Sequence, residues 1–153
     1  MGIRDKAIES GKIDIDGVEL EYFITECPVS SGYNGYIVFP KRPTIEEGFS
    51  GILNYVPVHG GITLSDNSEE GMIYGFDTAH YDSADYPISD VGWIKSQIQI
   101  MARGIIKATE VEKKYLRCTT NKGKAKYAQI VLDTTEEPYL GFGALLNILI
   151  GRA

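Results

Sequence analysis

The chain is poor in cysteine, histidine and tryptophan, and it has no hydrophobic run of membrane-spanning length. Its 153 residues include two Cys, two His and one Trp. Two cysteines, Cys27 and Cys118, are too few for the disulfide framework of a small secreted domain, so we expect reduced thiols. The first residues lack the apolar core of a secretory leader. These absences predict a cytoplasmic protein without a membrane partner.

Basic side chains are scarce in the first part of the chain. Residues 1–90 hold 16 acidic and 5 basic residues, a net charge of −11, whereas residues 91–130 hold 2 acidic and 9 basic residues, a net charge of +7. With −6 overall, the chain lacks the positive charge of a typical duplex-DNA binder, and we expect no duplex nucleic acid partner. The basic segment 113–126 could be a local anion site, or a solvated helix end whose cations complement the helix dipole.

The sequence also lacks the short motifs that reveal a reaction. It contains no Gly-x-Ser-x-Gly nucleophile motif and neither of the usual phosphate-binding glycine loops. With 43% hydrophobic and 24% charged residues, its composition is that of an ordinary globular protein. The length suits one domain with a real core, so we predict a single domain over residues 1–153.

Alternating apolar and polar residues predict an antiparallel sheet. Residues 13–25 alternate on both sides of Asp16-Gly17, a strong signal for a two-residue hairpin. Further short strands are predicted at 36–39, 52–58, 62–64, 72–76 and 127–132. A polar turn is predicted at 66–70, and pairing of 62–64 with 72–74 would follow from it.

One long amphipathic helix is predicted at about 90–116. Ile94, Ile98, Met101 and Ile105 recur at spacings of four and three, and Ser89 or Asp90 could cap the helix. The fold class is therefore α+β, an antiparallel β-sheet packed by this helix, with a short apolar C-terminal segment. That segment, Leu140–Ile150, is too short to span a bilayer. We expect it in the core or in a two-fold interface, and hence a homo-oligomer.

The two histidines are the main candidates for function, since both lie at predicted strand ends. His59 precedes Gly60-Gly61, and His80 follows Asp77 by three residues. If these strands are antiparallel neighbours, His59, Asp77 and His80 could hold a divalent transition metal or form a base with an orienting carboxylate. Gly60-Gly61 would let a ligand approach the backbone, where amides could hold an anion. Alternatively, these residues are structural. Gly60-Gly61 would then be a bulge, Asp77 would cap or turn the chain, and the histidines would make local hydrogen bonds.

Two further features could contribute to a site. The turn ending at Tyr36 could present an aromatic ring on which a base or sugar stacks. Alternatively, this segment is a hairpin turn followed by a tyrosine in the core. Asp82, Asp85 and Asp90 are interpreted as solvated loop acids and a helix cap.

The order and spacing of several motifs resemble a group of small, uncharacterised phage and prophage proteins. The motifs are Gly35-Tyr36-x-x-x-Pro40, Val58-His59-Gly60-Gly61-x-Thr63 and Gly75-Phe76-Asp77-x-Ala79-His80, followed by a long helix. The resemblance covers roughly residues 33–116. It implies a phage-borne setting and no particular activity.

Three hypotheses of function follow. The first is a phage-type accessory protein that binds a small anionic, nucleotide-like ligand through His59, Gly60, Gly61, Asp77, His80 and Tyr36, for example to sequester a host immune signal. The second is a metal-dependent hydrolase that uses His59, Asp77 and His80, with a divalent metal as cofactor. The third is an interaction protein that blocks a host partner through its apolar C-terminus.

Overall fold

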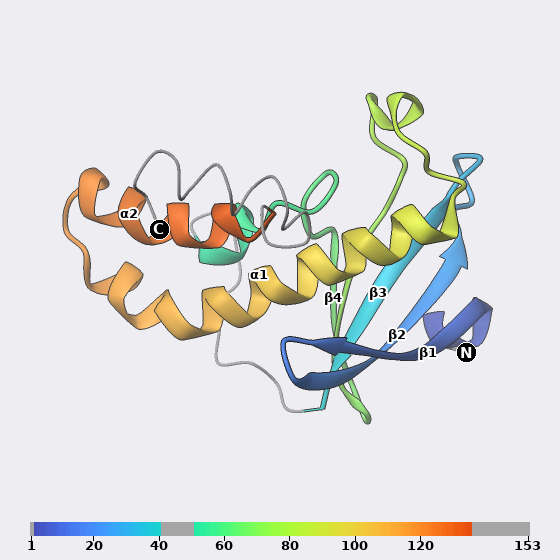
Figure 1. Ribbon diagram of the computed structural model, residues 1–153, viewed down its shortest axis with the longest axis horizontal. Helices are drawn as coiled ribbons and strands as arrows, with labels where there is room; N and C mark the ends of the chain where they lie inside the picture. The colour runs from blue at the N-terminus through green and yellow to red at the C-terminus, as the bar shows by residue number, and fades with distance from the viewer. Residues whose placement is uncertain (1, 41–50, 136–153) are drawn as a thin grey trace.

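The computed structural model describes residues 2–40 and 51–135. Within them, five strands form one antiparallel sheet in the order β1-β2-β3-β5-β4. The strands are β1 (Ala7–Ile15), β2 (Val18–Glu26), β3 (Tyr33–Phe39), β4 (Leu64–Ser68) and β5 (Gly71–Phe76). The long helix α1 (Val91–Arg117) crosses the sheet, and the shorter helix α2 (Asn121–Leu132) runs back beside its second half (Figure 1). The predicted α+β class is confirmed.

The first hairpin forms where the sequence predicts it. Ile15 pairs with Val18, and the two turn residues between them both have positive φ, 53° at Asp16 and 89° at Gly17. This is the backbone of a type I′ turn, whose twist matches that of the flanking strands. The Gly17 amide also donates to Asp14 Oδ1 over 2.8 Å.

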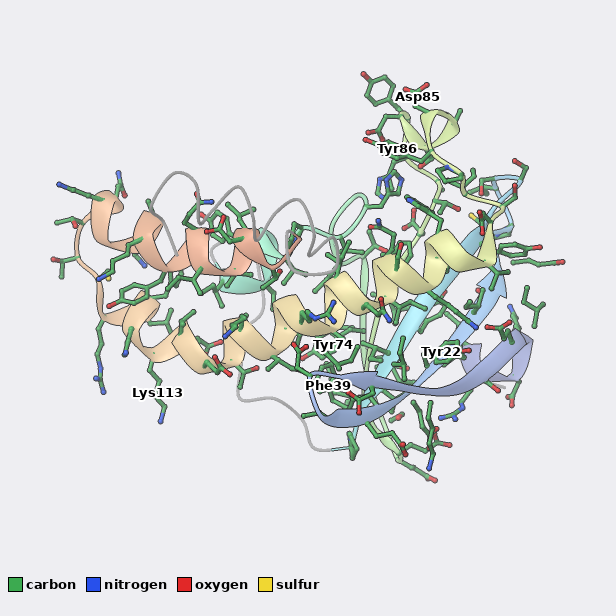
Figure 2. The ribbon with its side chains drawn as sticks, in the orientation of Figure 1. Tyr22, Phe39, Tyr74, Asp85, Tyr86 and Lys113 are labelled. Atoms are coloured by element: carbon green, nitrogen blue, oxygen red, sulfur yellow. The ribbon has the colours of Figure 1, made fainter. Side chains whose placement is uncertain are left out.

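The sheet is apolar on both faces, and a different element packs against each face. Leu20, Tyr22 and Ile24 alternate along β2 and face α1, whose Ile94, Ile98, Met101 and Ile105 are all 0% exposed. The opposite face carries a smaller cluster with Phe23 at its centre, bordered by residues of the 3₁₀-helix η1 (Ile3–Lys6). In Figure 2, Tyr22, Phe39 and Tyr74 lie between the sheet and α1.

Two predicted strands are in fact helical. Ile52–Tyr55 forms the 3₁₀-helix η2 rather than the start of a strand at 52–58, and its Ile52 and Leu53 enter the core. The segment 127–132, predicted as a last strand, belongs to α2, which Thr120 caps by accepting a hydrogen bond from the Gly123 amide. A short apolar run has no periodicity of its own, so packing against α1 decides between strand and helix.

The fourth strand starts later than predicted. It covers Leu64–Ser68, so that Leu64 pairs with Gly75 and Asn67 with Met72, and the turn shrinks to Glu69-Glu70. Among the described residues, none of the helices is long and apolar enough to cross a membrane. The segment Leu140–Ile150 lies outside the described residues, and the expected homo-oligomer therefore stays a prediction.

Candidate functional site

The antiparallel register brings three loops to one end of the sheet. Gly35, near the start of β3, pairs with Phe76 at the end of β5, and Leu64 at the start of β4 pairs with Gly75. The segments 27–32, 58–63 and 77–90 leave or enter the sheet at this end. Segment 77–90, called here the 77–90 loop, contains the 3₁₀-helix η3 (Ser83–Asp85) and projects beyond the sheet (Figure 1).

A tight turn presents His59. The Gly61 amide donates to the Val58 carbonyl over 2.9 Å, and Gly60 and Gly61 have φ of +69° and +79°. Gly60 lies so close to the His80 imidazole that a Cβ on Gly60 would be 2.0 Å from His80 Nε2. Gly60 therefore lets the backbone pass close to the His80 ring, and both glycines supply the positive φ of the turn.

Ser83 connects the two histidines. Its Oγ lies 2.9 Å from His59 Nε2 and accepts a 3.0 Å hydrogen bond from the His80 backbone amide. The Ser83 amide in turn donates to the His80 carbonyl over 3.0 Å. From the other side, Gln97 on α1 accepts the backbone amide of His59 over 2.9 Å. The turn at 59 is thus joined both to the 77–90 loop and to α1.

Aromatic rings enclose the His59 imidazole. Its ring centroid lies 5.5 Å from that of His80, 4.9 Å from that of Tyr86 and 5.4 Å from that of Trp93, each in an edge-to-face arrangement. Tyr86 and Trp93 also stack on each other with centroids 5.9 Å apart. These contacts restrict the rotation of the imidazole.

His80 lies beside a carboxylate. Its Nε2 is 3.3 Å from Asp77 Oδ1, and the same oxygen accepts the Ala79 amide over 2.9 Å. Among the described residues, no group makes a well-aligned hydrogen bond to this buried nitrogen. The two imidazoles thus lie close together at one end of the sheet, and Asp77 lies beside His80.

The surroundings of His59 favour its uncharged form on balance. Burial lowers the pKa of His59, and the neighbouring His80 lowers it further, while the carboxylates of Asp82 and Asp77 act in the opposite direction. Burial is the largest of these influences. A neutral imidazole in a partly apolar setting is the form that can accept a proton.

A hollow opens beside the histidines, between segment 27–32 and the 77–90 loop. It has a volume of about 660 Å³, and five hydroxyl side chains contribute to its wall together with His80, Tyr81 and Tyr86. The hydroxyls are those of Ser30, Ser31, Thr78, Ser83 and Ser89. None of the described residues that line the hollow is Lys or Arg. A volume of this size lies within the usual range of small-molecule sites.

No known family, curated protein or solved structure matches this chain. The resemblance to small phage proteins therefore stays a prediction carried by its motifs alone.

The predicted metal ligands do not form a metal centre. Within residues 2–40 and 51–135, no three side chains of His, Cys, Asp or Glu are arranged to hold a metal ion together. His59 Nε2 is engaged by the Ser83 hydroxyl, and Asp77 is directed to His80 and the Ala79 amide. The metal-dependent hydrolase gains no support from this geometry.

Tyr36 is not the exposed stacking surface that the sequence allowed. It is 5% exposed and stacks on Phe23 with ring centroids 4.6 Å apart, on the sheet face opposite α1. Burial raises the pKa of its hydroxyl. Of the two interpretations of this turn, the core tyrosine is the correct one.

The basic segment is also remote from the histidines. Lys113 lies toward the far end of α1 from the projecting loop that carries Asp85 and Tyr86 (Figure 2). Twenty residues of helix separate Trp93 from Lys113, which corresponds to about 30 Å. Cations at 113–126 therefore do not contribute to the hollow.

Sequence reasoning missed three residues that contact the His59 imidazole, namely Ser83, Tyr86 and Trp93. Ser83 belongs to no motif, and only its spacing of three from His80 could have indicated a turn contact. Trp93 follows the helix cap Asp90, whose Oδ1 accepts the Gly92 amide over 2.8 Å as predicted for a cap. Its ring meets the His59 imidazole edge to face, with centroids 5.4 Å apart.

Proposed function

We propose that this protein binds a small polar ligand with a planar ring, of nucleoside type, in the hollow beside the 77–90 loop. The observation that carries this proposal is the composition of the wall, in which Ser and Thr hydroxyls are combined with two tyrosines, Tyr81 and Tyr86. Hydroxyls can donate to and accept from a ribose or a base edge, and an aromatic ring can stack on a base.

The ring that would stack on the ligand is Tyr86. Its side chain is 45% exposed, so one part is open to the hollow while its ring stacks on Trp93 and meets the edge of His59. A ring fixed in this way loses little rotational freedom on binding. Tyr81 is fully exposed on the same loop and could close over a bound ligand.

The charges at this end of the molecule favour a neutral ligand over the anionic one that the sequence allowed. Asp77, Asp82 and Asp85 all belong to the 77–90 loop, and none of the described lining residues is Lys or Arg. A phosphate would meet these carboxylates without a cationic partner, at a cost in free energy. We therefore infer a nucleoside rather than a nucleotide.

Saturation-transfer NMR with adenosine and AMP tests this proposal. We expect saturation transfer to the adenine and ribose protons of adenosine, and weaker binding of AMP. Tyr86→Ala should weaken adenosine binding by about 1–3 kcal/mol, the usual contribution of an aromatic ring stacked on a base. The control is Tyr55→Ala, because Tyr55 is also partly exposed but contacts Tyr115, near the other end of α1.

Three results would contradict the proposal. They are an absence of transfer to any of the four common ribonucleosides, tighter binding of AMP than of adenosine, and equal effects of the two tyrosine variants. Capture of a host immune signal, which the sequence offered as an example of the first hypothesis, would then need a different site.

A further inference from the structure

We propose that Ser83 is a nucleophile with His59 as its general base, and that the hollow accepts small carboxylic esters. This inference rests on the proposed function, because the substrate must enter the same hollow. No nucleophile motif marks Ser83 in the sequence, and the pair arises only when the 77–90 loop folds back on the turn at His59.

The distance and the direction of the hydrogen bonds carry the inference. Ser83 Oγ lies 2.9 Å from His59 Nε2, within the reach of a nucleophile–base pair. The same Oγ already accepts the His80 amide over 3.0 Å. A hydroxyl has one proton to donate, and we infer that Ser83 donates it to His59 Nε2. That arrangement leaves the His59 proton on Nδ1.

The base is in the protonation state that the reaction needs and is held in place. Burial lowers the pKa of His59, which keeps the imidazole neutral near pH 7. The Gln97 contact fixes its backbone, and Trp93 and Tyr86 contact its ring. The groups that face it electrostatically are His80, Asp77 and Asp82, and the two carboxylates favour the imidazolium that forms during the reaction.

Access to Ser83 is through the hollow. The residue is 3% exposed, yet it forms part of the wall between His80 and Tyr86. A substrate therefore has to be small enough to enter. An ester with a planar leaving group would place that group against Tyr86, where the nucleoside ring is proposed to stack.

The reaction balances without a cofactor. Ser83 Oγ attacks the ester carbonyl carbon as its proton passes to His59 Nε2. The bond from that carbon to the leaving oxygen then breaks, and the leaving group takes the proton from His59 as an alcohol or phenol. Water attacks the acyl-serine, its proton passes through His59 to Ser83 Oγ, and a carboxylic acid is released.

A fluorophosphonate probe tests the pair, because it phosphonylates activated serines. We expect a single adduct on the unmodified full chain by intact-mass spectrometry, located at Ser83 by fragmentation. This result does not depend on the folding of any variant. Ser83→Ala should abolish the adduct, and His59→Gln should slow its formation by about 100- to 10,000-fold, the usual contribution of a general base. Ser10→Ala, an exposed serine on β1, is the control and should be labelled like the unmodified chain.

The pH profile separates a catalytic from a structural role. Labelling should fall in acid as His59 becomes protonated, with a midpoint below the ordinary histidine value of about 6.5. Turnover of p-nitrophenyl acetate should follow the same profile. A structural contact between Ser83 and His59 would not produce either dependence.

The outcomes also separate this inference from the proposed function. A chain that binds adenosine but is not labelled, or is labelled at another serine, overturns the nucleophile and leaves nucleoside binding intact. A chain labelled at Ser83 that shows no saturation transfer from any nucleoside refutes the proposed ligand and retains the catalytic pair.

Discussion

Replacement of Gly60 by alanine tests whether the close approach of backbone and imidazole organises the site. A Cβ at Gly60 would be 2.0 Å from His80 Nε2, much closer than van der Waals contact. Gly61 offers a matched control, because its φ is similarly positive, +79° against +69°, while a Cβ there would meet nothing within 4 Å. Gly61→Ala therefore changes only the backbone strain, and Gly60→Ala changes the strain and the contact with His80.

The expected magnitudes follow from this difference. An alanine in the left-handed region costs about 1–2 kcal/mol, and this cost applies to both variants. Forcing an extra carbon into an occupied space costs about 1–3 kcal/mol more, and this applies to Gly60 alone. We expect the free energy of unfolding to fall by about 1–2 kcal/mol in Gly61→Ala and by about 2–5 kcal/mol in Gly60→Ala. Urea denaturation followed by far-UV circular dichroism measures both.

Gly60→Ala made in a His80→Ala variant gives the decisive comparison. His80→Ala removes the ring, so Gly60→Ala in that background should cost only the backbone strain, like Gly61→Ala. The coupling energy between positions 60 and 80 would then equal the steric part. Equal losses in the two glycine variants, or no relief by His80→Ala, would refute the contact between Gly60 and His80.

The remaining predictions concern His59, the core and the helix cap. Because burial lowers the pKa of folded His59, the unfolded chain binds the proton more readily, so stability should fall as pH falls below about 6.5. Thermal melts between pH 7 and 5 should show this loss, and His59→Gln should remove the part due to His59. If the pH dependence of the melting temperature is the same in His59→Gln, its assignment to His59 is contradicted. Ile98→Ala, at a fully buried position, should cost about 2–5 kcal/mol in urea denaturation, whereas Leu116→Ala, 45% exposed, should change stability by less than about 0.5 kcal/mol. Asp90→Ala should cost about 1 kcal/mol in the same assay and Asp90→Asn almost nothing, since Asn caps as well as Asp; equal losses would argue against the cap.

Features that depend on local pattern could be predicted from the sequence. The hairpin at Asp16-Gly17 needs two residues that tolerate positive φ, and few pairs do so as readily. The helix over 91–117 is predicted by its cap and by the spacing of Ile94, Ile98, Met101 and Ile105. Short apolar segments could not be assigned in this way. Ile52 and Val131 are buried, and they would be buried in a strand as well as in a helix, so their apolar character does not distinguish the two. Packing against the neighbouring helix α1 determines that both segments are helical.

The candidate site was predictable in its position but not in its chemistry. His59, Asp77 and His80 converge because the segment with His59 leads into β4, and the loop with Asp77 and His80 leaves β5, the antiparallel neighbour of β4. The partner of each imidazole depends on how the 77–90 loop closes, and no periodic pattern describes that loop. Ser83 therefore had no signal of its own. The glycine-rich surroundings of Tyr36 resemble a turn, so the sequence allowed both an exposed ring and a core tyrosine. The burial of Tyr36 is explained by Phe23, which lies directly across the strand pair.

The single tryptophan of the chain, Trp93, has its ring against His59 and Tyr86. Its fluorescence is therefore a built-in optical reporter of the candidate site, and no label has to be attached. The far end of α1 and all of α2 carry no such chromophore, so emission follows the 77–90 loop rather than the whole molecule. Proteins open in parts as well as globally. An unfolding curve recorded by fluorescence that precedes the one recorded by circular dichroism would identify the site as the first region to open.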